Sequence, residues 1–154
     1  MAAYFFDSSA LVKRYVRETG TGWVISLFKP SGGHTCFVAR IASVEIVSAL
    51  TRRVRGATLS AAGGTKAIAR FRRAFSQKLF KIDITSDLLE FATALAEKHA
   101  LRGYDAVQLA AALQLHAERM AVNLPPIRLV SADDALNAAA MLEGLSVDNP
   151  NLHP

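Results

Sequence analysis

Short apolar segments alternate with longer segments of helical periodicity along nearly the whole chain, and this alternation limits the possible folds more than any other feature. The strand-type segments cover residues 3–6, 35–38, 79–84, 127–130 and 145–147. The helical segments between them cover residues 21–28, 41–55, 60–75, 85–100, 105–121 and 135–143. Strands that alternate with helices form a parallel sheet with helices on both faces. We therefore predict an α/β fold, a three-layer α/β/α sandwich around a central, mostly parallel sheet.

The chain has the length and composition of one globular domain. Its 154 residues are 51% hydrophobic and 20% charged, which excludes a disordered chain. We predict a single domain over residues 1–148, followed by a loose polar tail over residues 149–154. No apolar run is long enough for a membrane span, and no secretory signal is visible, so no membrane partner is expected. The single cysteine, Cys36, fits a buried strand position, and a reducing, cytoplasmic setting is expected.

Positive charge is concentrated in one part of the chain. The net charge is +5, and no acidic residue lies between Glu45 and Asp83. The basic residues of this interval are Arg52, Arg53, Arg55, Lys66, Arg70, Arg72, Arg73, Lys78 and Lys81. A local patch of one sign attracts nucleic acid or an acidic protein partner. The alternative is a solvated face that only aids solubility.

Three aspartates occupy the starts of helical segments. Asp7 and Asp133 each follow a strand-type segment and precede a helix, and Asp105 begins the alanine-rich segment 105–121. In an open α/β sheet, ligands bind beyond the carboxyl ends of the strands, which is where such residues lie. The alternative is that each aspartate only caps its helix, with Gln108 completing a capping box at Asp105.

Glu45 cannot be explained as a cap. It lies within a helical segment among apolar neighbours, and neither Ile41 nor Ala49, four residues away on either side, can neutralise it. Burial of an unpaired carboxylate is costly, so Glu45 needs a partner or a solvent-filled cleft. Either it stands on a half-exposed helix face, or it joins the aspartates at the edge of the sheet.

Four carboxylates in one cleft would repel one another unless a cation lay between them. Ligands that are all oxygen favour a hard ion such as Mg²⁺ or Mn²⁺ over Zn²⁺. Such an ion holds a phosphodiester, lowers the pKa of a coordinated water and stabilises the leaving oxygen. Acids beside a basic segment therefore indicate a metal-dependent nuclease.

Four motifs together resemble the PIN domain, and more narrowly the VapC-type toxins of bacterial toxin–antitoxin pairs. These motifs lie at residues 7–15 (Asp-Ser-Ser-Ala-Leu-Val-Lys-Arg-Tyr), 43–45 (Ser-Val-Glu), 104–113 (Tyr-Asp-Ala-Val-Gln-Leu-Ala-Ala-Ala-Leu) and 130–133 (Val-Ser-Ala-Asp). Leu136 continues the last of them, and the four motifs span nearly the whole chain in order.

The resemblance implies a Mg²⁺- or Mn²⁺-dependent endoribonuclease with RNA as its substrate. It carries over Asp7, Glu45, Asp105 and Asp133 as metal-binding and catalytic acids. Ser131 matches a small hydroxyl residue beside the last acid, and Ser8 matches the position after the first. Asp134 is the alternative to Asp133.

The resemblance also implies protein partners. It predicts a homodimer or a toxin–antitoxin hetero-oligomer, with a cognate antitoxin whose segment crosses the active-site groove. The helical segments 41–55 and 60–75 would form the arm that this antitoxin grips.

Three other functions remain as alternatives, and the sequence hardly separates the first of them from the toxin. The first is a PIN nuclease of RNA processing without a toxin role, and the second is a non-catalytic module that binds nucleic acid or protein through its basic segment. The third, a phosphoaspartyl phosphatase, is weaker because its usual second aspartate, two residues after the nucleophile, is Ser9 here.

Overall fold

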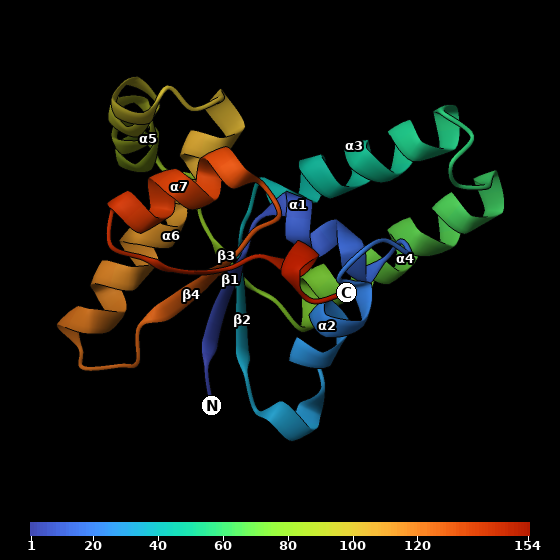
Figure 1. Cartoon of the computed structure of the whole chain (residues 1–154), viewed down its shortest axis with the longest axis horizontal. Helices are drawn as coiled ribbons and strands as arrows, with labels where there is room; N and C mark the ends of the chain where they lie inside the picture. Colours follow the sequence, from blue (N-terminus) through green and yellow to red (C-terminus); the bar gives the residue numbers. More distant parts are fainter.

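The computed structural model describes all residues from 1 to 154 and is organised around a five-stranded sheet (Figure 1). The strands are β1 (Ala3–Phe6), β2 (Thr35–Ala39), β3 (Phe80–Ile82), β4 (Ile127–Val130) and β5 (Ser146–Asp148). They are ordered β3-β2-β1-β4-β5, and every neighbouring pair is parallel. The sheet predicted from the sequence is therefore confirmed, with β3 at one edge.

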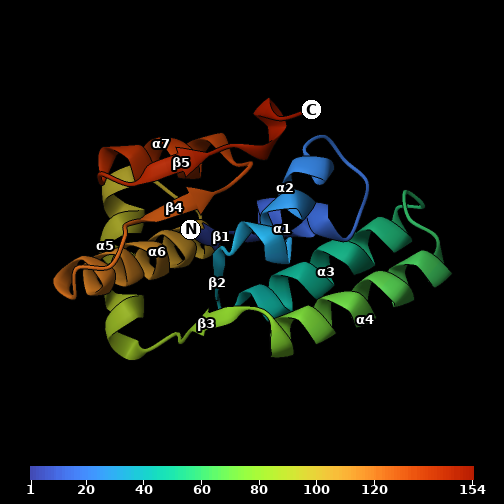
Figure 2. The ribbon, with the colours of Figure 1, turned by 90° about the horizontal axis from the view of Figure 1, so that it is seen from below.

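Helices cover both faces of this sheet, as Figure 2 shows. One layer contains α1 (Ser8–Leu11), α2 (Thr21–Leu27), α3 (Ala42–Arg55) and α4 (Ala61–Gln77). The other contains α5 (Ser86–His99), α6 (Gly103–Ala121) and α7 (Asp134–Leu142). Each layer encloses its own cluster of buried apolar side chains against the sheet. The three-layer sandwich is thus confirmed, and none of its helices combines the length and apolar character needed to cross a membrane.

Helix α6 lies against the centre of the sheet because its first half is apolar on nearly every side. Residues 106–112 are all buried, including the polar Gln108. Such all-round burial is expected of a helix between a sheet and a second helical layer. This packing holds the first turn of α6 beside the carboxyl end of β1.

Helices α3 and α4 form an antiparallel pair that projects from the sheet (Figure 1). Phe71 and Leu50 are buried on the inner faces, and most basic side chains point to solvent. Gly64 allows the close approach near the tip, since a Cβ there would lie 2.4 Å from Val54 Cγ2. Gly64, which weakens α4 by propensity, therefore serves its packing on α3.

Two segments differ from the sequence-based prediction. The first helix is short, because α1 gives way to a 3₁₀ turn, η1 (Val12–Arg14). The tail predicted to be loose instead packs on α2 and contains η3 (Pro150–Leu152). The His153 ring stacks on Trp23 with centroids 4.2 Å apart, and Pro150 is buried. The polar and proline-rich composition of this segment gave no sign that a histidine near its end would stack on an aromatic ring.

Candidate active site

Asp7 stands directly after the central strand β1 and is 3% exposed. Its carboxylate caps α1 by accepting a hydrogen bond from the Ala10 amide at 3.1 Å, and it also accepts one from Ser9 Oγ at 2.8 Å. Burial raises the pKa of Asp7 to about 7, although these hydrogen bonds oppose the rise, and the charge of Glu45 adds to it. A strongly raised pKa at the mouth of a groove is typical of functional sites.

Glu45 lies in the first turn of α3 and faces Asp7 and the start of α6. Its Oε1 accepts a hydrogen bond from Gln108 Nε2 at 2.7 Å, and the same amide group lies 3.4 Å from Ser8 Oγ. Burial raises the pKa of Glu45, the hydrogen bonds from Gln108 and Ser8 lower it, and Asp105 raises it further. The side chain therefore belongs to the acidic edge of the sheet rather than to an isolated helix face.

One arginine side chain joins Asp105 and Asp133. Arg102 Nε donates to Asp105 Oδ2 at 2.9 Å, and Arg102 Nη2 donates to Asp133 Oδ2, also at 2.9 Å. Asp133 caps α7 by accepting a hydrogen bond from the Leu136 amide at 2.8 Å. Asp105 is not a cap, since the N-cap position of α6 is Arg102. The capping box considered for Asp105 and Gln108 does not form, because Gln108 donates to Glu45 instead.

All four acids line a single groove of about 1170 Å³ between the two helical layers. Its walls come from α3 on one side and α5 on the other, and Tyr104 and Arg102 stand at its rim. Ser8 also lines this groove, whereas Ser131 and Asp134 lie outside it. Ser131 is fully buried and accepts a hydrogen bond from the Asp133 amide at 3.1 Å, so it positions the loop. Asp134 is exposed and 3.4 Å from Asn149 Nδ2.

The donor chemistry of this groove suits a hard divalent ion. The candidate ligands that line it are carboxylate and hydroxyl oxygens. Gln108 is not among the lining residues, but its Oε1 is buried without a hydrogen-bond partner. The charges of Asp7, Glu45 and Asp105 disfavour one another, which a cation would reverse. As the side chains are placed here, no three His, Cys, Asp or Glu residues are grouped to hold an ion. The residues thus fit the ion by chemistry, and side-chain adjustment would have to complete the coordination.

Two functional side chains were missed by sequence reasoning. Arg102 was not singled out from the sequence, although its position three residues before Asp105 places it at the N-cap of α6, within reach of that carboxylate. Gln108 was considered as a capping partner, and only the fold shows that its amide reaches Glu45. Spacing along one helix could have indicated the first contact but not the second.

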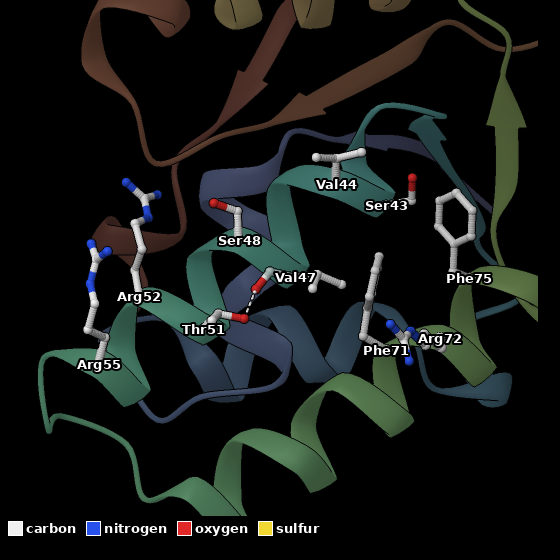
Figure 3. A pocket seen from close by; sticks show the side chains of 10 residues that line it. All are labelled: Ser43, Val44, Val47, Ser48, Thr51, Arg52, Arg55, Phe71, Arg72 and Phe75. Atoms are coloured by element: carbon white, nitrogen blue, oxygen red, sulfur yellow. Dashed lines mark hydrogen bonds between the residues drawn. The ribbon is translucent and has the colours of Figure 1, made fainter.

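The basic segment of α3 and α4 is only partly free to bind ligands. Arg53 pairs with Glu18, and Lys81 Nζ donates to the Phe75 carbonyl at 2.8 Å. A second groove of about 770 Å³ runs between the two helices (Figure 3). Arg52, Arg55 and Arg72 border it. It shares Val44, Ser48 and Arg52 with the acidic groove, so the two form one continuous surface.

Comparison with known proteins identifies the family. No family model matches the chain. Two ribonucleases of Mycobacterium tuberculosis, VapC45 of strain CDC 1551 / Oshkosh and VapC49 of strain ATCC 25618 / H37Rv, are each 31% identical to it over 154 residues, the full length of both proteins. The chain belongs to the VapC ribonuclease family of PIN-domain proteins. The resemblance inferred from the four motifs is therefore confirmed.

Solved structures of toxins and toxin–antitoxin complexes share the fold. A toxin–antitoxin complex from Klebsiella pneumoniae matches with a TM-score of 0.62 and 19% identity, covering 96% of this chain and 97% of that one. The sarcin–ricin-loop-cleaving toxin VapC20 of Mycobacterium tuberculosis matches with a TM-score of 0.60 and 18% identity, covering 88% and 94%. VapBC2 from Rickettsia felis, bound to a DNA fragment from its promoter, matches with a TM-score of 0.58 and 13% identity, covering 96% of this chain and 98% of that one. The VapC fold is thus reproduced over almost the entire chain.

Proposed function

We propose that this VapC protein is a metal-dependent endoribonuclease that acts as the toxin of a toxin–antitoxin pair. The observation that carries the proposal is the convergence of Asp7, Glu45, Asp105 and Asp133 on one groove. Its full-length relatives are ribonucleases, which supports RNA as the substrate.

In this proposal Asp7 and Asp105 are the principal ligands of Mg²⁺ or Mn²⁺, and Glu45 and Asp133 complete the shell and orient the attacking water. When bound, the ion would polarise the phosphodiester, acidify a water and stabilise the leaving oxygen.

The surrounding side chains hold these acids in place. Ser9 donates a hydrogen bond to Asp7, and Gln108 donates one to Glu45. Ser131 Oγ accepts a hydrogen bond from the backbone amide of Asp133. Asp7, with its pKa raised to about 7 by burial, can hold a proton on its carboxylate near neutral pH when no cation offsets that burial. Fixed acids of this kind reduce the reorganisation needed in the reaction.

We further propose a cognate antitoxin that crosses the acidic groove and grips the arm formed by α3 and α4, within a homodimer or a toxin–antitoxin assembly in the cytoplasm. The Klebsiella pneumoniae neighbour is a toxin–antitoxin complex, which supports such a partner. The unpaired positive charge along the arm suits an acidic segment of that protein.

RNA cleavage tests the nuclease. We expect cleavage with Mg²⁺ or Mn²⁺, none in EDTA, and a loss of at least 100-fold in Asp7→Ala or Asp133→Ala. Asp134→Ala is the matched control, because that neighbouring carboxylate lies outside the groove. Cleavage that persists in EDTA, or that survives Asp7→Ala, would refute the metal mechanism.

Two further observations separate the rival functions. Expression of the wild-type chain should arrest growth, and co-expression of a small DNA-binding protein encoded directly upstream should restore it. Harmless overexpression would favour a nuclease of RNA processing. If millimolar Mg²⁺ and Mn²⁺ left the melting temperature unchanged, a non-catalytic binding module would be favoured, since an ion bound to the folded state must stabilise it.

A further inference from the structure

A single guanidinium group occupies both acids at the α6–α7 side of the groove. Arg102 donates one hydrogen bond to Asp105 and one to Asp133, each at 2.9 Å. The arginine side chain is 78% exposed, whereas the two aspartate side chains are 15% and 22% exposed. An exposed cation thus covers two partly buried anions.

Both carboxylate oxygens of Asp133 already accept a hydrogen bond. Its Oδ1 accepts the Leu136 amide at 2.8 Å, and its Oδ2 accepts Arg102. Each oxygen keeps a second lone pair, but a cation that used the one on Oδ2 would lie close to the guanidinium charge, so the two cations repel each other unless Arg102 moves. The Leu136 amide is fixed in the first turn of α7, but the Arg102 side chain is exposed and rotates at little cost.

On the basis of the metal-dependent function proposed above, we propose that Arg102 competes with the divalent ion for the carboxylates of Asp105 and Asp133. Each of these carboxylate oxygens accepts a guanidinium hydrogen bond and is therefore a poorer ligand for a metal ion. The positive charge of Arg102 also repels a divalent cation bound at the same oxygens. Arg102 therefore lowers the affinity of the chain for its ion.

The displaced arginine remains at the groove because its backbone is held at the N-cap of α6. There its fork of donors matches a phosphate oxygen pair as well as it matched two carboxylates. Arg102 would thus exchange acidic side chains for a phosphate of the RNA when the ion enters. Arg102 would in this way couple the binding of the metal ion to the binding of the RNA.

Titration with Mn²⁺, followed by calorimetry or electron paramagnetic resonance, tests the competition without reference to activity. Arg102→Ala should bind Mn²⁺ more tightly by on the order of 10-fold, the effect of removing one nearby charge at a solvent-exposed site. Arg102→Lys keeps the charge but loses the fork, so its affinity should fall between the two. Arg119→Ala is the control, since it removes the same charge about 25 Å away at the other end of α6.

Steady-state cleavage at saturating Mn²⁺ tests the second contact. Arg102→Ala should raise KM for RNA several-fold and change kcat less, with partial rescue by Arg102→Lys. A purely structural role would lower the melting temperature and would not tighten Mn²⁺ binding.

The outcomes distinguish this inference from the proposed function. If the wild type binds and requires Mn²⁺ but Arg102→Ala binds it no more tightly, the competition is refuted and the nuclease mechanism stands. If the wild type cleaves RNA in EDTA and binds no Mn²⁺, both are refuted.

Discussion

Asp7 should make the folded chain less stable as the pH rises. Burial raises its pKa from the ordinary 3.8 to about 7, so the folded state holds the proton more tightly than the unfolded state does. Stability is therefore greatest when Asp7 is protonated in both states, and it falls between about pH 4 and pH 7. A shift of this size corresponds to about 4 kcal/mol of unfolding free energy.

The variant Asp7→Asn isolates this effect because it preserves the shape of the side chain and removes its titration. Urea unfolding of both proteins in EDTA, at several values between pH 4 and pH 8, gives the difference in unfolding free energy, in which other titrating groups cancel. From pH 4 to pH 8, we expect the unfolding free energy of the variant to rise by about 4 kcal/mol relative to that of the wild type. Added Mn²⁺ should restore the wild type at pH 8, since the ion binds the charged carboxylate.

Parallel stability curves for the wild type and Asp7→Asn would refute this reasoning. They would mean that the Asp7 carboxylate ionises in the folded chain as easily as in the unfolded one. A smaller gain, of 1 to 2 kcal/mol, would show that Ser9 and the Ala10 amide compensate more of the burial than inferred here.

Two other substitutions probe the packing and the site. Gly20→Ala should destabilise the fold by at least about 2 kcal/mol in urea unfolding, because its φ is +84° and the new Cβ would lie 2.2 Å from the Pro150 carbonyl oxygen. Gly22→Ala, with nothing within 4 Å of its Cβ, should instead be neutral or stabilising, and equal effects would contradict the packed tail. Gln108→Leu should lower the unfolding free energy by about 1 to 2 kcal/mol, because the loss of the donor to Glu45 outweighs the removal of a buried oxygen that has no partner. It should also slow RNA cleavage by roughly 10-fold by freeing Glu45, and unchanged cleavage would exclude a positioning role for Gln108.

Periodicity was enough to predict the sheet and the helices that cover it. Strands such as β1 and β4 are short apolar runs, and the all-round apolar character of α6 already indicated a central helix. Contacts between elements could not be predicted in this way, because they depend on side-chain reach across the folded chain. The stack of His153 on Trp23 is one such contact.

The candidate site shows the same division. Position at the carboxyl end of a strand marked Asp7 and Asp133, and the lack of a helical partner marked Glu45. The pairing of Glu45 with Gln108 and the bridge through Arg102 required coordinates, since each joins segments more than 25 residues apart. A carboxylate can also cap a helix and line the groove at the same time. Asp7 and Asp133 each do so.

The position of β1 in the middle of the sheet has a consequence for when the protein can become active during its synthesis. This strand is made before the other four, yet one of its two neighbours, β4, is made only after β2 and β3. Ser9 Oγ likewise accepts a hydrogen bond from the Ala132 amide, 123 residues later, at 2.9 Å. A nascent chain therefore carries Asp7 well before it gains the support that completes the groove, which delays any attack on the RNA around the ribosome.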